Sequence, residues 1–401
     1  MGIDYTTKTI EEVRVSVCSM RIAVIAPNFP PMIGGLSDYT LAWCRSVNQH
    51  HDVHIEVITR SSAAQPIGIK IGAPVDRWSW RGRGALFVAI AQARPDIVVL
   101  QYVPHAFSRR GGGLSFALAL YSALRRLEVP LVTHAHELTG EFGRALHRYP
   151  WLIAQRVAVH VLVAISAQSV VTVGGRQARL QLRFVPYQDR IKCIPIGPTI
   201  APTARDPMWR QRYEISDDTL IVVTFGLGHA SHDMSVLPRL LDECIERGLD
   251  VRLVVFGHAL VEHPLCLTLG FVDEKQAAAV MADSDLAAFN IKDGASGRRS
   301  VVISALGAGL PVVSTRGPDT DDAWFPASGI KLTKAGDDDA FVEAVIELLQ
   351  DTSARDSLRS GGRLVFDAHF SWQTVSEEWL RVLRTALGAE CRKDGRSPRG
   401  R

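Results

Sequence analysis

Short apolar runs alternate with helical patterns along most of this 401-residue chain, and this alternation constrains the fold more than any other feature. We expect buried strands of a first series near 21–26, 54–59, 96–101, 131–134, 161–164 and 192–195. We expect a second series near 220–225, 251–256, 266–269, 286–289, 310–314 and 330–332. Buried strands separated by helices are typical of doubly wound α/β domains with parallel sheets. The sequence therefore predicts two successive α/β domains with Rossmann-like sheets.

The length also favours two domains, because a single hydrophobic core rarely serves more than about 250–300 residues. A polar, proline-containing stretch follows Ile196-Gly197-Pro198 and places the boundary near residue 200. The predicted organisation is an N-terminal extension at 1–19, a first domain at 20–200, a second domain at 201–370, a helix at 371–388 that can cross back to the first domain, and a disordered basic tail at 389–401.

The net charge of +3 hides an uneven distribution of charged residues. Residues 1–200 carry a net charge of +10, whereas residues 201–401 carry −7. The basic first half would suit an anionic membrane surface or an acidic acceptor, and a spread of solvated arginines is the alternative interpretation. We expect no nucleic-acid partner.

Several features of the sequence indicate the cellular compartment of the protein. Six cysteines are scattered without a CxxC pair, which argues against a disulfide framework and a zinc site and favours a reducing cytoplasm. The first 20 residues include acidic side chains and lack an apolar core, unlike a secretory signal. The most apolar long stretch, 149–166, is interrupted by Gln155, Arg156 and His160, which argues against a membrane span. We therefore predict a cytoplasmic protein and leave open a peripheral contact with the inner face of the membrane.

A polar loop with paired arginines begins the stretch 293–315, ahead of an apolar helix pattern and a buried strand. Small residues let backbone N–H groups approach an anion, and guanidinium groups can bind phosphate oxygens in pairs. The start of a helix adds a partial positive charge. The residues that would surround a phosphate are Ser296, Gly297, Arg298, Arg299 and Ser300. A pair of solvated arginines at a helix start is the alternative.

Glycine-containing loops follow the first strand of each predicted domain. Gly34 and Gly35 follow the first of these strands and precede a helix, but the GxGxxG pattern of dinucleotide folds is absent, so nicotinamide chemistry is a weak hypothesis. A simple turn is the other interpretation of these glycines. Gly226 follows the first strand of the second domain and could bring an anion or substrate close to the backbone, where His232 could contact it.

Polar side chains follow the strand near 131–134, in the order His134-Ala135-His136-Glu137. A histidine at the carboxyl edge of a sheet could hold a hydroxyl group, and the carboxylate could orient it. A metal site is a weaker hypothesis because two ligands lack a convincing third. A histidine that is simply hydrogen-bonded at the end of a strand is the structural alternative.

Three acidic clusters, at 283–285, 319–322 and 337–339, could bind a divalent ion beside a nucleotide diphosphate. Solvated turns are the interpretation that we prefer for all three clusters.

Together these residues resemble the GT-B glycosyltransferases, and among them the retaining, nucleotide-sugar-dependent enzymes of family 4. The resemblance covers roughly residues 20–388 and is carried by the segments PMIGG at 31–35, THAHE at 133–137, AIS at 164–166, IPIG at 194–197, LGFV at 269–272, ALGAGLPVV at 305–313 and FSW at 370–372. Each segment is weak alone, but their order and spacing are fairly specific. The resemblance implies two Rossmann-like domains that face a cleft, with the acceptor on the first and the donor nucleotide on the second.

The same resemblance implies transfer of a sugar from a nucleoside diphosphate sugar to a hydroxyl acceptor, such as a saccharide or lipid-linked saccharide in a bacterial polysaccharide or glycolipid pathway. No cofactor or metal ion is expected, because arginines and helix dipoles can stabilise the leaving diphosphate. The expected catalytic residues are His136 and Glu137. The expected donor-binding residues are Gly34, Gly35, Ser166, Gly226, His232, Asp293, Ser296, Gly297, Arg298, Arg299, Ser300 and Ser304.

The sequence departs from the family pattern at positions that matter for the donor. The usual Glu-x7-Glu is replaced by Ser296 and Ser304, and the usual Arg and Lys that hold the diphosphate fall on Leu227 and His232. A divergent active enzyme would need the paired arginines of the 293–315 stretch to supply the positive charge. The alternatives are a sugar-nucleotide epimerase-like enzyme of the same fold and a non-catalytic scaffold with a degenerate donor site.

Overall fold

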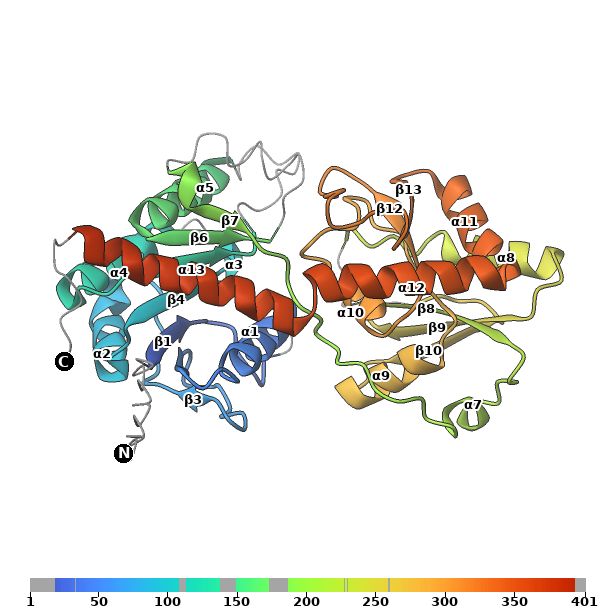
Figure 1. Ribbon diagram of the computed structural model, residues 1–401, viewed down its shortest axis with the longest axis horizontal. Coiled ribbons are helices and arrows are strands. Elements are labelled where there is room, and N and C mark those ends of the chain that lie inside the picture. Colours follow the sequence, from blue (N-terminus) through green and yellow to red (C-terminus); the bar gives the residue numbers. More distant parts are fainter. Residues whose placement is uncertain are drawn as a thin grey trace, which may run out of the picture.

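The computed structural model describes residues 19–393, except 33, 108–112, 138–148, 173–186, 227, 229 and 259. It consists of two α/β domains that lie side by side, each built on one parallel sheet (Figure 1). Leu227 lies outside the described residues, so the structure does not place the residue at the family's Arg position.

The first domain contains a seven-stranded parallel sheet with the strand order β3-β2-β1-β4-β5-β6-β7. Its strands are β1 (Met20–Ile25), β2 (Val53–Ile58), β3 (Lys70–Ile71), β4 (Ile97–Tyr102), β5 (Leu131–Ala135), β6 (Gln168–Val171) and β7 (Ile191–Cys193). Its helices are α1 (Gly35–Val47), α2 (Arg83–Ala93), α3 (Pro104–Phe107), α4 (Gly113–Leu127) and α5 (Tyr149–Ile165), with short 3-10 turns at η1 (Trp80–Gly82) and η3 (Gln188–Arg190). The order reverses between β1 and β4, and ligands of such sheets bind outside the carboxyl ends of the strands at this reversal.

The second domain repeats this plan with the strand order β10-β9-β8-β11-β12-β13. Its strands are β8 (Leu220–Gly226), β9 (Val251–Gly257), β10 (Cys266–Gly270), β11 (Leu286–Phe289), β12 (Val312–Arg316) and β13 (Lys331–Lys334). The helices that follow β7 are α7 (Trp209–Arg212), α8 (Leu237–Glu246), α9 (Glu274–Asp283), α10 (Ser300–Gly307), α11 (Asp338–Gln350), α12 (Thr352–His369) and α13 (Trp372–Lys393). The reversal of strand order here lies between β8 and β11.

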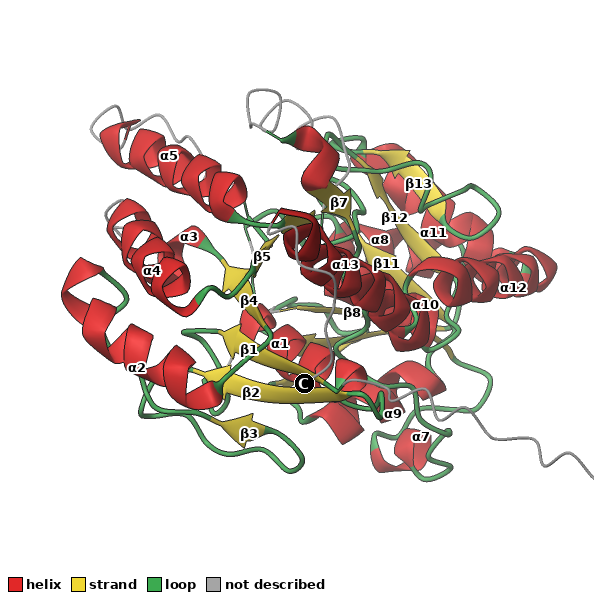
Figure 2. Cartoon of the chain, turned by 60° about the vertical axis from the view of Figure 1, so that its left-hand side comes forward, coloured by secondary structure: helices red, strands yellow, loops and turns green. Residues whose placement is uncertain are grey.

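Two layers of helices cover each sheet, as the burial of apolar side chains requires. In the first domain, α2, α4 and α5 pack on one face, and α1 and α13 pack on the other (Figure 2). In the second domain, α9 and α10 pack on one face, and α8 and α11 pack on the other. None of the helices in the described ranges is both long and apolar enough to cross a bilayer.

One predicted strand is wrong. Residues 161–164 belong to α5, and the strand of this region is β6, which begins only at Gln168. The error has a physical reason, because a continuous apolar run buried against a sheet looks the same in a helix and in a parallel strand. The two-residue strand β3 was not predicted, and most other strands begin or end one or two residues away from the expected positions.

The helix α13 follows the second domain in sequence but packs on the first (Figure 1). The indole of Trp379 is fully buried and lies 5.1 Å from that of Trp43 in α1, measured between ring centroids. Trp372 Nε1 donates a hydrogen bond to the carbonyl oxygen of Pro198 (2.9 Å), and Ser46 Oγ donates one to the carbonyl oxygen of Trp372 (3.2 Å). The two chain segments that join the domains therefore contact each other.

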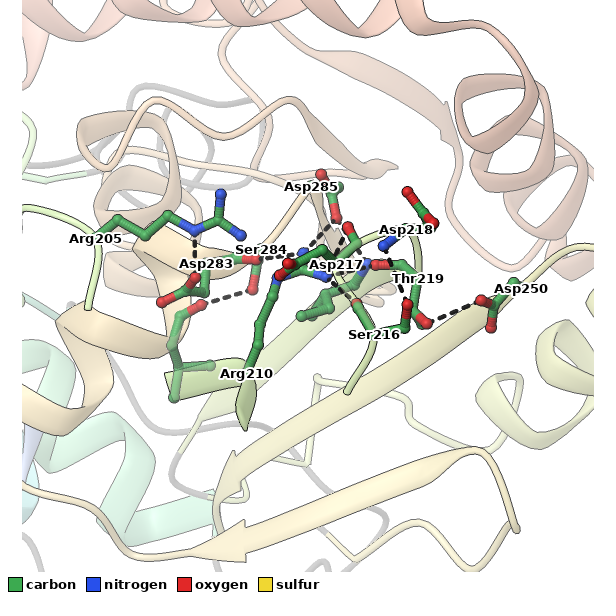
Figure 3. A network of polar contacts seen from close by, with 12 residues as sticks. Arg205, Arg210, Ser216, Asp217, Asp218, Thr219, Asp250, Asp283, Ser284 and Asp285 are labelled. Atoms are coloured by element: carbon green, nitrogen blue, oxygen red, sulfur yellow. Dashed lines mark hydrogen bonds and ion pairs between the residues drawn. The ribbon is translucent and has the colours of Figure 1, made fainter. Parts of the chain in front are cut away.

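The acidic cluster at 283–285 forms ion pairs with the linker between the domains (Figure 3). Asp283 is buried and pairs with Arg205, while Asp285 pairs with the buried Arg210 and accepts a hydrogen bond from Ile221 N (2.8 Å). Arg210 also donates to the carbonyl oxygens of Ser216 and Thr219. The prediction of solvated turns is therefore wrong here, since buried carboxylates need charged partners.

The other two acidic clusters differ from each other. Asp319 is buried against Arg298, so that cluster is also not a simple solvated turn. Asp337 caps α11, because its side chain accepts a hydrogen bond from Ala340 N (3.1 Å). No group of three metal-ligating side chains occurs within the described part of the chain.

Candidate active site

The two domains meet at the carboxyl ends of their sheets. Ile196 N donates a hydrogen bond to the carbonyl oxygen of Gly297 (2.8 Å). A Cβ atom at Gly297 would lie 2.6 Å from the carbonyl oxygen of Thr172, which follows β6. The loop between β11 and α10 therefore packs directly against the first domain, and only glycine fits at this position.

In the second domain, four charged side chains form a cluster at this junction. Arg298 Nη2 donates hydrogen bonds to Asp293 Oδ2 (2.6 Å) and Asp319 Oδ2 (2.8 Å). Arg299 Nη2 donates to the carboxylate of Asp293 and to Ser231 Oγ (2.7 Å). We call these four charged residues, Asp293, Arg298, Arg299 and Asp319, the arginine–aspartate cluster.

The charges of this cluster cancel. Two guanidinium groups face two carboxylates. The side chain of Arg298 is only 25% exposed, and that of Arg299 is 12% exposed. In the protein without ligand, both arginines are therefore paired with carboxylates, and whether they bind a diphosphate stays a prediction. The sequence indicated the arginines, but it did not indicate that Asp319, from the loop after β12, would lie against them.

The two carboxylates of the cluster differ in how firmly they hold a negative charge. Burial opposes ionisation of Asp293, but the charges of Arg299 and Arg298 outweigh burial and lower its pKa. At Asp319 burial outweighs the attraction of Arg298 and raises the pKa. Asp319 therefore holds its negative charge less firmly than Asp293 does.

The first domain brings Glu137 to the same junction. Burial opposes ionisation of Glu137, but a hydrogen bond from His105 and the charges of His105 and Arg298 lower its pKa. His105 Nε2 lies 3.1 Å from Glu137 Oε2, and the pKa of His105 is raised mainly by this hydrogen bond. Glu137 therefore lies within electrostatic range of Arg298 in the second domain.

Two histidines lie beside Glu137. His134 is fully buried in β5, and His136 follows the strand and is partly exposed. Their side chains share one partner, since His134 Nδ1 is 2.9 Å and His136 Nε2 is 2.7 Å from Gln101 Oε1. Burial lowers the pKa of His136 to about 3. The pKa of His134 is lowered well below its usual value, mainly by burial and to a smaller extent by the nearby His136. Both rings are therefore neutral at pH 7.

The glycine loop of the first domain is open. A Cβ atom at Gly34 or Gly35 would meet nothing within 4 Å, and these residues begin α1. Asp38 in the same helix has a raised pKa. The main cause is burial, and the charge of Glu274 in α9 adds to it. The start of α1 therefore lies within electrostatic range of α9 in the second domain and has space beside its backbone.

The remaining predicted donor-binding residues fall into two groups. Ser166, Ser296 and Ser304 are buried, and two of them bond to the protein itself. Ser166 Oγ donates to the carbonyl oxygen of Leu162 (2.7 Å), and Ser304 Oγ accepts from Thr199 N (3.2 Å) in the linker. Ser300, Gly226 and His232 form the second group and lie at the end of β8, in the loop after it and at the start of α10. His232 bridges to Ile291, and Ser300 begins α10.

Sequence patterns do not predict four residues of this candidate site: Gln101, His105, Ser231 and Asp319. Gln101 ends a predicted strand, which is a weak signal, and Asp319 was noticed only as part of an acidic cluster. Each acquires its significance from contacts with residues far away in sequence.

Comparison with known proteins agrees with this architecture. Residues 222–351 match the family described as glycosyl transferases group 1. No curated protein matches the chain. The fold is that of GT-B glycosyltransferases, and the predicted fold class is confirmed.

Three solved structures illustrate the likeness. The chain is similar to sucrose-phosphate synthase from Thermosynechococcus elongatus, with 14% identity and a TM-score of 0.68 over 92% of this chain and 99% of that one. It is also similar to Anabaena HepE in complex with UDP and glucose, with 16% identity and a TM-score of 0.68. That match covers 91% of this chain and 100% of HepE. A third similar structure is WaaG, a glycosyltransferase involved in lipopolysaccharide biosynthesis, with 16% identity and a TM-score of 0.61. That match covers 89% of this chain and 98% of WaaG.

Proposed function

We propose that this protein is a retaining glycosyltransferase that moves a sugar from a nucleoside diphosphate sugar to a hydroxyl acceptor without a metal ion or cofactor. One observation carries the proposal. Polar and charged side chains of both domains, Glu137 and His136 from the first and the arginine–aspartate cluster from the second, converge where the carboxyl ends of the two sheets meet. The match of the second domain to group 1 glycosyltransferases supports the same reaction class.

The donor diphosphate would bind at the arginine–aspartate cluster. A diphosphate carries more negative charge than one carboxylate, so it can displace Asp319 from Arg298 and take over the guanidinium group. The backbone at Gly34 and Gly35 leaves space for the donor on the opposite side. His136 would hold a hydroxyl group of the transferred sugar, and Glu137 would lie near the reacting carbon or the acceptor hydroxyl.

The acceptor is proposed to be a saccharide or lipid-linked saccharide of a polysaccharide or glycolipid pathway, used at the cytoplasmic side. Two proteins that share the fold support this choice. WaaG is involved in lipopolysaccharide biosynthesis, and HepE has been solved in complex with UDP and glucose. A fold shared at this level of identity does not specify the sugar.

A second candidate is a non-catalytic scaffold with a degenerate donor site. Ser296 and Ser304 are buried at the positions where the family resemblance expects glutamates. The charges of the arginine–aspartate cluster also cancel. These features favour a protein that keeps the fold and has lost its donor.

Nucleotide binding by calorimetry separates the two candidates. For a glycosyltransferase we expect UDP or GDP to bind. Arg298→Ala should weaken that binding at least tenfold, about 1.4 kcal/mol, because a guanidinium partner of the phosphates is lost. Asp319→Asn should strengthen it, since the amide keeps the shape of the side chain but no longer competes as an anion.

The control for this experiment is Asp321→Asn, which changes the same charge in the same loop outside the cluster. Absence of binding to UDP, GDP and ADP in all variants would support the scaffold. Binding that neither Arg298→Ala nor Asp319→Asn changes would remove the cluster from the donor site. Product analysis with a nucleotide sugar alone would reveal an epimerase, because no acceptor is present.

We also propose that the first domain touches an anionic membrane surface through the outer faces of α2, α4 and α5. These three helices lie side by side (Figure 2) and carry large apolar side chains that are exposed to solvent. These side chains are Trp80, just before α2, and Val88, Leu118, Tyr121, Trp151, Ile153 and Val157. Exposed arginines accompany them at 81, 83, 125 and 126. Apolar side chains interspersed with cations fit an anionic lipid surface.

Co-sedimentation with vesicles tests this contact. We expect the protein to pellet with vesicles that contain phosphatidylglycerol, less with vesicles of phosphatidylcholine alone, and less at high salt. Ile153→Asp should reduce the bound fraction severalfold. Ile245→Asp, which changes an equally exposed isoleucine in α8 of the second domain, should not. Equal loss in both variants, or no binding to either vesicle, would contradict the proposed surface.

A further inference from the structure

Gln101 and the two histidines lie on one face of the first sheet for a simple geometric reason. Strands β4 and β5 run parallel, and Gln101 pairs in register with His134. Side chains in register point to the same face of a sheet, as do side chains two residues apart along a strand. The side chains of Gln101, His134 and His136 therefore project to the face that α1 and α13 cover.

This face offers the rings little other than apolar and aromatic surface. The ring centroid of Tyr39 in α1 lies 5.4 Å from that of His134 and 4.9 Å from that of His136. Trp379 in α13 lies 4.8 Å from His134. Both Gln101 and His134 are fully buried, and each has a buried Nε2 atom without a partner in the described structure. The amide oxygen of Gln101 therefore has a dominant influence on where the ring protons lie.

One oxygen atom that accepts from two rings determines both tautomers. A carboxamide oxygen has no hydrogen, so each ring must donate from the nitrogen that faces it. His134 then carries its proton on Nδ1, and His136 carries its proton on Nε2. A neutral imidazole has a single N–H group, which leaves Nδ1 of His136 as an acceptor.

We propose that Gln101 is a positioning residue that holds His136 as the Nε2–H tautomer, so that His136 Nδ1 accepts a hydrogen bond from a hydroxyl group of the sugar. The part of this inference that concerns the sugar rests on the proposed function, whereas the part that concerns the tautomer does not. A ring held in this way is a hydrogen-bond acceptor and not a proton carrier. The low pKa of His136, caused mainly by burial, agrees with that role, because the ring stays neutral at pH 7. The titratable groups around it are His134, Glu137 and Tyr39.

Histidine tautomers are visible by ¹⁵N NMR, which gives a test without any substrate. In the intact protein with labelled histidine, we expect His136 as Nε2–H and His134 as Nδ1–H between pH 6 and 8, with assignments from His134→Asn and His136→Asn. Gln101→Met has nearly the same volume but no polar atom, and it should give a mixture of tautomers at His136. Gln101→Glu keeps acceptor oxygens, so each ring should still donate from the same nitrogen, while the added negative charge should raise the pKa of both histidines.

A matched control is Gln168→Met, which removes another buried glutamine from the same sheet, at a position in register with Val132 and not with either histidine. Thermal melts of all variants show whether each one is folded. The inference is overturned if His136 of the wild type is the Nδ1–H tautomer, which would mean that the amide group donates to both rings. It is also overturned if folded Gln101→Met keeps the wild-type tautomers.

The functional part has its own measurement. A lost or misdirected hydrogen bond to the sugar should lower the affinity for a UDP-sugar about threefold to tenfold in Gln101→Met, while the affinity for UDP alone stays unchanged. An equal loss for UDP and UDP-sugar would overturn a role toward the sugar. If the wild type binds no nucleotide at all, the proposed function fails, and the NMR result still decides whether Gln101 sets the tautomers.

Discussion

At the scale of single residues, ionisable groups behave differently on the two sides of the domain junction. In the first domain, His134 and His136 are kept neutral by burial among aromatic rings. In the second domain, Asp293 and Asp319 are held by paired arginines. The junction therefore offers neutral hydrogen-bonding rings on one side and charged groups paired with each other on the other side.

The buried histidines predict a pH dependence of stability. Their pKa values in the folded protein lie below the unfolded value of about 6.5, so the unfolded chain binds more protons as the pH falls through 6.5. The free energy of unfolding should therefore fall with decreasing pH, by up to about 1.4 kcal/mol per pH unit for each histidine. His105 acts in the opposite direction, because its folded pKa is raised and its contribution is lost as the pH rises. Urea unfolding at pH 5, 6 and 7.5 measures this slope.

The comparison protein for this measurement is His134→Asn combined with His136→Asn. Both asparagines lack a titratable ring, so the slope between pH 5 and 6.5 should become shallower than in the wild type. An unchanged slope would show that these rings do not resist protonation in the folded state.

At the scale of secondary-structure elements, the junction between linker and α13 depends on close packing at a glycine. A Cβ atom at Gly197 would lie 2.6 Å from the ring of Trp372, whose Nε1 donates to the carbonyl oxygen of Pro198. Gly197→Ala should therefore destabilise the protein by about 1–3 kcal/mol, because the indole ring must shift. Gly388→Ala in α13 is the control, since its new methyl group meets nothing within 4 Å. Thermal unfolding of both variants checks the prediction, and equal melting temperatures would contradict it.

Elements also show where sequence patterns are ambiguous. Short apolar runs bounded by polar residues, such as 286–289, were recognised as strands at their observed bounds. The long apolar run of α5 was divided wrongly, because burial on the sheet removes the polar face that would have revealed its helical period. Ion pairs between the linker and α9 were invisible as well, since Arg205 and Asp283 are 78 residues apart.

At the scale of the whole molecule, α13 follows the second domain in sequence but belongs to the core of the first. Trp379 follows the entire second domain in sequence, yet its side chain packs against Trp43 and His134 of the first. Trp379→Ala should lower the stability of the first domain by about 3–5 kcal/mol and leave the second nearly unchanged. Scanning calorimetry should show one transition moving to lower temperature. Leu364→Ala, at an exposed position of α12, should move neither transition, and a shift of both by Trp379→Ala would contradict this division.

The sequence by itself determined the class of fold and predicted the general location of the candidate site. Buried strands and helices alternate with recognisable lengths, and parallel sheets place their carboxyl-end loops at one edge, so Gly34, His136 and Arg298 could be assigned to that edge without coordinates. The partners of those residues were decided only by the tertiary structure. Asp319 reaches Arg298 from a loop 21 residues away, and Gln101 reaches His134 from a strand 33 residues earlier. Strand register and loop packing create these contacts, and neither leaves a periodic signal in the chain. The charge balance of the cluster and the tautomer of His136 are therefore properties of the folded molecule.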